Sequence, residues 1–426
     1  MENLKDIESM NEFDLHMPDE ALPIQVKQNK SVIGKISLSN YPTGARSNYG
    51  EDQNTEFEIN VQNSQQLLLS SSVICCDVTL KGNTADKSVT YSGGQTALKS
   101  LTISLDNKKL VDLQNHADKV ADFNLRSTST EQELNRYYAT IGYKRQMLND
   151  DTVSLRINLK HYGCDIGNLL PTGTIGSTLR INGTINNNTL TQLSDGIGTG
   201  GEEPGNGCVL TYDNIRLESE FVELQPMLLS KRIERIKSSS GLTIPFHTFS
   251  VDSRSLTNTS SFNERIALSY NNVVALYQIP YGNAKTVDYY DNLTWGDNSM
   301  DQIRDYYVNF DGSQYYNLNS NAGQSGYASH AQALINASRN EFTIEGAGGL
   351  MIYNMEDYQA LACNFVRSNN VLSPSITDSG VNARLQSGII NTKCDFNNDL
   401  DNNQLITIIK FTRRIVFKGG AMDVFS

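Results

Sequence analysis

A glycine-rich segment of the chain matches the sequence pattern of a phosphate-binding loop. Residues 196–201 read GIGTGG and match the GxGxxG pattern, in which a buried strand leads into a helix whose N-terminus holds a pyrophosphate. Here Glu202 and Glu203 follow at once, and Pro204 and Gly205 come next. Two carboxylates would repel phosphate and no helix begins, so we expect a surface loop instead of a nucleotide site.

A second segment offers oxygen ligands at alternating positions, as a calcium loop does. These are Asp395, Asn397, Asp399 and Asp401. The sixth position is Leu400 where an EF-hand has Gly, and the twelfth is Ile406 where it has a bidentate Glu. The EF-hand reading therefore fails. We expect a solvated hairpin loop, with a looser calcium site as the alternative.

His161 and Cys164 form the closest histidine–cysteine pair in the sequence. A metal site needs three or four ligands, and no others are near in sequence, so we predict a structural role for both residues. The five histidines form no recognisable motif: His16, His116, His161, His247 and His330. The segment 323–326, GQSG, is one residue too short for a nucleophile elbow. The sequence thus predicts no catalytic residue, no cofactor site and no metal site.

Paired tyrosines leave two interpretations open. They occur at 289–290, 306–307 and 315–316. Such pairs suit sugar-stacking platforms, and they equally suit contact surfaces between subunits, where tyrosine is enriched. Aspartate and glutamate are plentiful, and spacing in sequence does not fix spacing in space, so a carboxylate pair for glycoside hydrolysis also stays open.

Strand-type alternation of apolar and polar residues dominates the elements that must position these side chains. Leu101, Ile103 and Leu105 alternate with polar neighbours, and so do Leu155, Ile157 and Leu159. Further strands are predicted at 33–38, 57–61, 179–181, 215–221, 266–270, 273–279, 405–409 and 415–417. Many short strands separated by Asn, Gly and Ser turns indicate an all-β sandwich or barrel with helical insertions.

Four short helices are predicted between these strands. They cover residues 115–124, a segment after a capping box formed by Thr130 and Glu133, residues 327–337 and residues 227–237. In the second, Leu134, Tyr137, Tyr138 and Ile141 share one helical face. In the last, the basic residues Lys231, Arg232, Arg235 and Lys237 predict a connector helix with a solvated face, in preference to a lipid or nucleic-acid contact.

Length and composition limit the classes of protein to which the chain can belong. The chain has 426 residues, which favours two domains of about 200 residues each. Its net charge of −12 argues against direct nucleic-acid binding. No apolar run approaches the ~20 residues that span a bilayer, and the acidic residues 1–20 lack the features of a signal peptide. The six cysteines are expected to be reduced thiols made in a cytosol, and neighbours such as Cys75 and Cys76 point to opposite faces of a strand.

The order of segments resembles that of double jelly-roll major capsid proteins of Polinton-like viruses, virophages, adenoviruses and tailless membrane-containing bacteriophages. Residues 98–110, LKSLTISLDNKKL, resemble a strand that ends in an acidic turn before a helical excursion. Residues 154–160, 169–171 and 179–182 resemble a strand, a Leu-Pro loop and a strand of that family. The resemblance covers residues 98–226, and the second half is similar more weakly, through strand spacing and a final pair of strands within 405–417.

The resemblance implies two consecutive eight-stranded jelly rolls. The expected boundaries are 1–30 for an N-terminal arm, 31–225 for the first roll, 226–241 for a connector and 242–426 for the second roll. It also implies a virion protein, made in the host cytoplasm, that forms pseudo-hexagonal homotrimers tiling an icosahedral shell without catalysis. Expected partners are neighbouring capsomers, penton proteins and minor or cement proteins. Whether the virion has an internal membrane is left open. The rival functions are a carbohydrate-binding adhesin or fibre protein and, third, a glycoside-active β enzyme.

Overall fold

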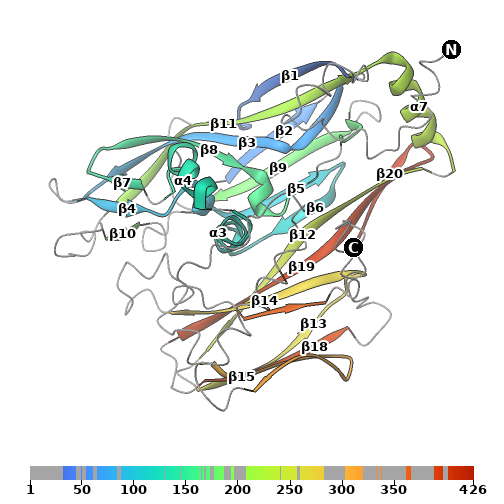
Figure 1. Ribbon diagram of the computed structural model, residues 1–426. Coiled ribbons are helices and arrows are strands. Elements are labelled where there is room, and N and C mark those ends of the chain that lie inside the picture. The colour runs from blue at the N-terminus through green and yellow to red at the C-terminus, as the bar shows by residue number, and fades with distance from the viewer. Residues whose placement is uncertain are drawn as a thin grey trace.

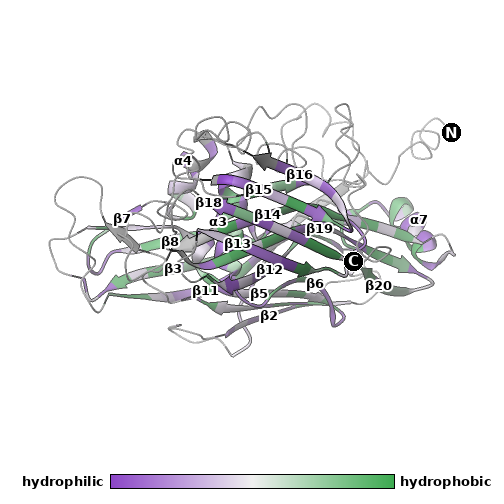
Figure 2. Cartoon of the chain, turned by 90° about the horizontal axis from the view of Figure 1, so that it is seen from below, coloured by the Kyte–Doolittle hydropathy of each residue, from purple (hydrophilic) through white to green (hydrophobic). Residues whose placement is uncertain are grey.

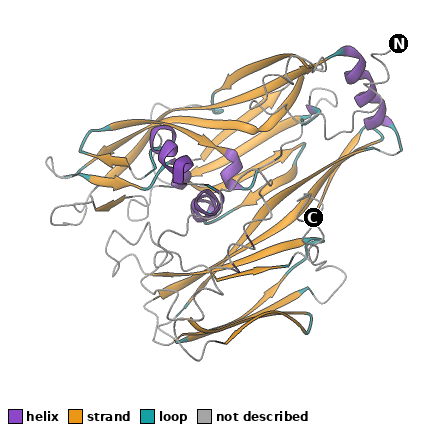
Figure 3. Cartoon of the chain, viewed as in Figure 1, coloured by secondary structure: helices purple, strands orange, loops and turns teal. Residues whose placement is uncertain are grey.

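The structure of the protein is a computed structural model in which the greater part of the chain can be described. The described residues are 32–44, 49, 54–60, 65–83, 88–129, 131–143, 145–164, 166, 169–172, 177–186, 193–195, 208–239, 241–256, 260–282, 303–319, 333, 337, 361–365, 388–396 and 402–426. Strands predominate among them, and the helices lie between or beside the sheets (Figure 1, Figure 3).

Two antiparallel four-stranded sheets form the first half, which we call the first roll (Figure 1). One contains, side by side, β1 (Val32–Asn40), β11 (Val209–Leu224), β3 (Gln65–Lys81) and β8 (Thr152–Asn158). The other contains β2 (Asn54–Asn60), β9 (Thr178–Ile185), β5 (Leu98–Leu105) and β6 (Lys108–Leu113). Numbered in chain order, these eight strands pair as 1-8-3-6 and 2-7-4-5.

The second half, the second roll, repeats this order of strands. One sheet contains β12 (Leu242–Ser255), β19 (Asn402–Lys418), β14 (Val273–Gly282) and β17 (Leu361–Asn364). The other contains β13 (Ser261–Ala267), β18 (Ile389–Phe396), β15 (Ile303–Phe310) and β16 (Ser313–Asn319). The pairing is again 1-8-3-6 and 2-7-4-5. Eight antiparallel strands in two such sheets are a jelly roll, so the predicted fold class, all-β with two consecutive jelly rolls and helical insertions, is confirmed.

Alternating side chains explain why these segments form strands of a two-sheet core. In β5, Leu101, Ile103 and Leu105 are buried, whereas the residues between them are half-buried. In β8, Leu155 and Ile157 are buried between the sheets, and the residues between and beside them face outward. Each buried Leu or Ile side chain stabilises the fold by about 1.5–3 kcal/mol. Green and purple alternate along many strands in Figure 2 for this reason.

The sheet β12-β19-β14-β17 differs, because it is buried on both faces. In β14, Ala275 and Tyr277 belong to the core that continues into the first roll, and Leu276 belongs to the core between the two sheets of the second roll. In β19, Ile408 belongs to the core that continues into the first roll, and Ile409 belongs to the core between the two sheets of the second roll. The apolar run 273–277 and the run 405–409, interrupted only by the buried Thr407, are thus the signature of a sheet that lies between two layers.

The α-helices whose bounds lie within the described residues are α3 (Ala117–Thr128), α4 (Glu131–Thr140) and α7 (Pro226–Lys237). Three short strands, β10 (Leu193–Asp195), β4 (Val89–Tyr91) and β7 (Arg145–Met147), form a small additional sheet. The helix predicted at 115–124 begins and ends later, as α3, while those predicted after Thr130 and at 227–237 are confirmed as α4 and α7. Thr130 and most of 327–337 lie outside the described residues. Of the residues predicted to share a face of α4, Tyr138 is 47% exposed with the guanidinium of Arg145 over its ring, and Ile141 lies beyond the end of this helix.

Two strand predictions are corrected. The pair predicted at 405–409 and 415–417 is one strand, β19, which continues through Lys410; this lysine is 1% exposed. A further strand, β20 (Ala421–Phe425), follows it and pairs with its end. The strand predicted at 266–270 ends at Ala267, and Tyr270 instead stacks on Phe411 with ring centroids 3.8 Å apart. The predicted domain boundaries stay a prediction. Within the described residues, no helix is long and apolar enough to cross a membrane.

Candidate functional site

The contact between the two rolls is built around α3. This helix lies between the rolls (Figure 1), and its Phe123 ring is 4.7 Å from the ring of Tyr277 in β14. The Tyr277 hydroxyl donates to the carbonyl oxygen of Ala337 at 2.9 Å. Ile244 and Phe246 of β12 join the same apolar core as the strands of the first roll. The two rolls therefore share one continuous core.

Polar contacts at the edge of the first roll extend this interface. The Arg413 Nη1 of β19 donates to the carbonyl oxygens of Leu110 at 2.7 Å and Lys109 at 3.1 Å, both in β6. Lys108 forms an ion pair of 3.1 Å with Asp423 of β20. The second roll therefore covers the outer edge of β6, which would otherwise present unpaired backbone groups.

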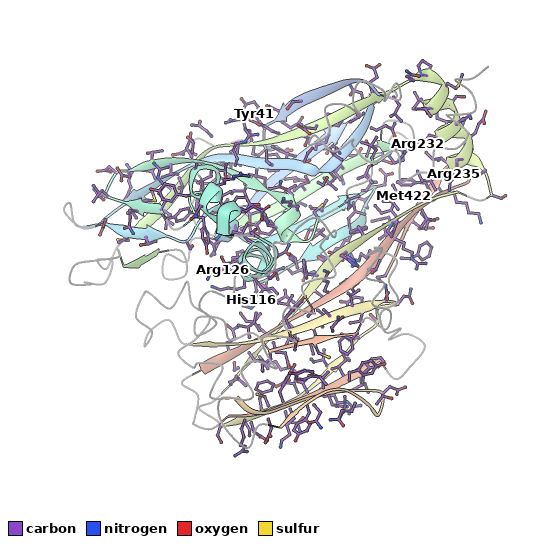
Figure 4. The ribbon with its side chains drawn as sticks, viewed as in Figure 1. Tyr41, His116, Arg126, Arg232, Arg235 and Met422 are labelled. Carbon is purple, nitrogen blue, oxygen red and sulfur yellow. The ribbon has the colours of Figure 1, made fainter. Side chains whose placement is uncertain are left out.

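His116 joins the two rolls at the start of α3. Its backbone has a φ of 57°, in the left-handed region, and its Nε2 lies 3.0 Å from the Ser253 Oγ of β12. Burial lowers the pKa of His116, although the carboxylate of Asp118 opposes the shift. Figure 4 shows His116 at the side of the first roll that faces the second.

A buried ion pair within α3 is linked to the rest of the first roll through Gln95. The Arg126 Nε lies 3.0 Å from the Asp122 Oδ2, one helical turn apart, and both side chains are almost fully buried. Gln95 donates from Nε2 to the Asp122 Oδ1 at 2.9 Å, and the Arg126 guanidinium lies 5.9 Å from the centre of the Tyr143 ring. Because removing one partner would leave a buried charge, this pair makes the position of α3 sensitive to either residue.

The outward side of the sheet β1-β11-β3-β8 carries three charged residues beside an aromatic one, which we call the first outer face: Tyr41, Arg156, Arg216 and Glu218. Glu218 forms ion pairs with Arg156 at 2.7 Å and with Arg216 at 3.1 Å. Tyr41 directly follows β1 and is 68% exposed on this side of the roll (Figure 4). This face therefore combines charges that are paired in salt bridges with an exposed aromatic ring.

Asp77 of β3 extends the same outward side. It accepts hydrogen bonds from the Asn214 Nδ2 at 2.7 Å and from the Ser154 Oγ at 2.6 Å. These hydrogen bonds, that from Asn214 first, lower the pKa of Asp77 below its usual value. The carboxylate is therefore held in its charged form by strands β8 and β11 on either side of it.

The outward side of the sheet β13-β18-β15-β16 is the corresponding surface of the second roll, the second outer face. Asp395 forms ion pairs with Lys393 at 2.7 Å and with Arg304 at 3.8 Å, and Arg304 also pairs with Asp305 at 3.2 Å. Tyr307 of β15 is half-buried beside them. Charges of both signs thus alternate across this face.

The structure separates the sequence-predicted histidine and cysteine residues from any shared site. His161 and Cys164 are both buried; the ring of His161 lies edge-on to Tyr137 at 5.5 Å, and burial lowers the pKa of His161 to about 3. The structural role predicted for this pair fits that burial. All six cysteines are free and buried. Among the described residues, no three His, Cys, Asp or Glu side chains are grouped so that they could hold a metal ion.

Several other predicted segments can be placed only in part. Asp395 of the calcium-like run lies in β18, whereas Asn397, Asp399 and Asp401 lie outside the described residues. His16, His330, the segment 196–205 and the segment 323–326 also lie outside them. The expectations for these segments stay predictions.

The basic connector helix departs from its predicted solvated face at one residue. Lys231, Arg235 and Lys237 are exposed on α7, but Arg232 is 5% exposed, and its Nη2 donates to the carbonyl oxygen of Leu169. The reason is helical spacing, because Arg232 lies on the buried row with Leu228 and Ile236.

Of the tyrosine pairs within the described residues, Tyr306 is a core residue, Tyr315 and Tyr316 are half-buried against that core, and Tyr307 is half-buried on the second outer face. Tyr306 is fully buried and its ring lies 5.6 Å from that of Tyr316, and the Tyr315 ring lies 5.3 Å from that of Phe365. Neither reading of these pairs, as sugar platforms or as subunit contacts, fits Tyr306. The pair at 289–290 lies outside the described residues.

Comparison with known proteins relates this architecture to viral capsids. No protein-family model and no curated protein sequence matches the chain. Among solved structures, the PBCV-1 virus capsid matches with a TM-score of 0.63 and 11% identity over 92% of this chain and 96% of that one. The Faustovirus major capsid protein matches with a TM-score of 0.63 and 11% identity over 97% of this chain and 94% of that one. The mavirus major capsid protein matches with a TM-score of 0.51 and 9% identity over 96% of this chain and 94% of that one.

The chain has the double jelly-roll fold of viral major capsid proteins. The resemblance predicted from residues 98–226 is thereby confirmed at the level of fold, and it extends over most of the chain. The identity to these structures is only 9–11%. The repeated strand order, visible in the pairing of β1 with β11 and of β12 with β19, takes the place of a motif.

Sequence reasoning missed the part of the double jelly roll that joins its halves. The helix α3 was predicted as an excursion across the end of a sandwich, yet it packs between the rolls. The residues of this helix gave no clear signal, because seven of its twelve residues are polar or charged, and most of these, such as Asp122, Asn124 and Arg126, are nevertheless buried.

Proposed function

We propose that the protein is a viral major capsid protein that assembles as pseudo-hexagonal homotrimers tiling an icosahedral shell. The observation that carries the proposal is the strand order 1-8-3-6 and 2-7-4-5, found twice in one chain and shared along nearly the whole length of known capsid proteins. Three copies of a two-roll chain supply six similar rolls, which is the number a hexagonal outline needs.

The contact inside the chain suggests how copies meet. Within one subunit, β6, the fifth strand of the first roll, and α3 lie against the 1-8-3-6 sheet of the second roll. The fifth strand of the second roll is β16, which borders the second outer face, and the 1-8-3-6 sheet of the first roll presents the first outer face. We expect β16 and the second outer face of one copy to lie against the first outer face of the next. Such a head-to-tail contact closes into a ring when three copies complete the turn.

The chemistry of the two faces supports this contact. Tyr41 is exposed on the first outer face, and aromatic residues are enriched in interfaces. The first outer face carries Glu218 with two arginines, and the second carries Asp395 and Asp305 with Arg304 and Lys393. Alternating charges of both signs set the register of two faces and add little to affinity by themselves.

Assembly in this proposal needs no catalysis. Each contact between trimers is modest, and repetition of the contact around every capsomer makes the shell stable. Neighbouring capsomers, penton proteins and minor or cement proteins are the proposed partners, without direct nucleic-acid binding. The proposed location is the virion, after synthesis in the host cytoplasm, where the six buried thiols would stay reduced.

The mass of the purified protein in solution tests the proposal. Light scattering coupled to size exclusion should give about three times the chain mass of 47.2 kDa, with larger species at high protein concentration. A strict monomer that binds glycans would contradict it and would favour the adhesin instead.

A further inference from the structure

One side of α7 is anchored and the opposite side faces solvent. Leu228, Arg232 and Ile236 are four residues apart and form the buried row. Met227, Lys231 and Arg235 form the next row with the same spacing and are exposed; Met227 is 45% exposed. We call Met227, Lys231, Arg235 and the exposed Lys237 the basic face of α7. Figure 4 shows Arg232 and Arg235 on this helix at the end of the molecule.

The basic face is extended by the last turn of the chain. The backbone N–H of Gly420 donates to the carbonyl oxygen of Ile236 at 3.3 Å, which holds the β19–β20 turn against the end of α7. The exposed Lys418, the last residue of β19, directly precedes this turn. Glu234 also lies on the exposed side of the helix, so four cationic residues outnumber one acid here, in a chain whose net charge is −12.

The N-terminal residues join the body beside this face. Val32 at the start of β1 pairs with Leu224 at the end of β11, and α7 begins at Pro226, two residues later. The 31 residues that precede Val32 therefore enter the fold next to the first turn of α7.

These N-terminal residues have the opposite charge. Residues 1–20 contain seven acidic residues, Glu2, Asp6, Glu8, Glu12, Asp14, Asp19 and Glu20, and one lysine. Apolar residues such as Ile7 and Met10 lie among the acids and suit contact with the exposed Met227. The residues 21–31 can span up to about 35 Å when extended, whereas the 12 residues of α7 are about 18 Å long. The acidic segment can therefore reach the whole basic face.

We propose that residues 1–20 dock on the basic face of α7 of their own subunit. The tether raises the local concentration of the acidic segment to about the millimolar range, which favours this contact over one with a separate molecule. The contact is electrostatic and exposed, so salt weakens it strongly. The proposal does not depend on a shell function, because it uses only the charges and the attachment point of the segment.

Zero-length cross-linking of the full-length protein tests this contact. A carbodiimide couples a carboxylate to a lysine that touches it, and mass spectrometry identifies the two residues. We expect links from acids within residues 1–20 to Lys231, Lys237 or Lys418, and we expect their yield to fall at least fivefold in 1 M salt. In oligomers refolded from a mixture of light and heavy isotope-labelled protein, the links should join residues of the same isotope form.

Matched variants sharpen the result. Arg235→Glu reverses a charge on the basic face and should lower the yield of links at Lys231 and Lys237 at least fivefold. Lys81→Glu, an exposed lysine at the end of β3, should leave them unchanged. Links spread over exposed lysines such as Lys81 and Lys108, or links only between differently labelled copies, would overturn the proposal.

Discussion

Two neighbouring residues at the end of β8 show how much depends on which side of a strand a side chain lies. Ile157 is buried in the core of the first roll, whereas Asn158 lies on the outer side, where its Oδ1 accepts a hydrogen bond from the backbone N–H of Lys160 at 2.9 Å. This acceptor caps the short helix Leu159–Tyr162. An aspartate could take over the acceptor at 158 but would be an isolated charge at 157.

We therefore predict that Ile157→Asp prevents soluble folding, because a buried unpaired carboxylate costs several kcal/mol. Asn158→Asp should change the free energy of unfolding by less than about 1 kcal/mol, since the capping acceptor is kept. Soluble yield and denaturant unfolding measure both. Equal losses in the two variants would mean that the register of β8 is wrong.

The buried His161 and the half-buried His247 make stability depend on pH. Burial lowers the pKa of His161 and of His247 from the usual 6.5 to about 3. Below pH 6.5 each histidine is protonated in the unfolded chain but stays neutral in the folded chain. The free energy of unfolding is therefore unaffected by these histidines above pH 6.5, and it decreases as the pH falls from 6.5 toward 3. At pH 5 each histidine should cost about 2 kcal/mol of unfolding free energy.

Denaturant unfolding at pH 7 and pH 5 measures this dependence. In His161→Gln, the difference between the two free energies should shrink by about 2 kcal/mol relative to the unmodified protein, because one titrating group is gone. An unchanged difference would show that His161 takes up its proton in the folded state.

At the scale of elements, the two rolls approach most closely where a glycine leaves room. Gly163, after β8, has a φ of 80°, and a Cβ placed on it would lie 2.6 Å from the Phe249 Cδ2 of β12 in the second roll. Gly312 has a similar φ of 77°, but no atom lies within 4 Å of its added Cβ. The two glycines separate backbone strain from crowding between the rolls.

Gly163→Ala should lower the free energy of unfolding by about 1 kcal/mol because of its left-handed backbone, and by a further ~1–3 kcal/mol because the added methyl group overpacks against Phe249. Gly312→Ala should lose only the first of these. Thermal or denaturant unfolding of both variants tests the close approach of the rolls, and losses of the same size would argue against it.

The elements also show where the sequence was informative. Alternation located strands such as β5 and β8, because their two faces meet a core and a polar surface. It failed at β19, where Lys410 looked like the end of a strand, because the strand is buried on both faces and its partners lie more than a hundred residues away in β12 and β14. The interface around α3 was missed for the same reason: burial of Phe123 depends on Tyr277, which is distant in the chain.

For the whole molecule, the two outer faces decide how copies meet. Tyr41 is the exposed aromatic residue of the first outer face, and Tyr138 on α4 is also exposed but lies on another side. Tyr41→Asp should weaken the trimer at least tenfold, because truncation of a central aromatic residue commonly costs an interface more than about 1.4 kcal/mol.

Tyr138→Asp is the matched control and should leave the trimer unaffected. The concentration at which the mass falls from trimer to monomer, followed by mass photometry or light scattering, compares the two variants. Equal weakening, or none in either, would contradict the assignment of the first outer face to the contact between copies.

Electron microscope images of the purified protein test the central claim most directly. Six rolls from three copies should give particles of hexagonal outline whose averaged projections have threefold symmetry, and these particles should associate side by side at high concentration. Averages that show isolated single chains, or closed rings of another symmetry, would contradict the proposal that this double jelly roll builds a capsid.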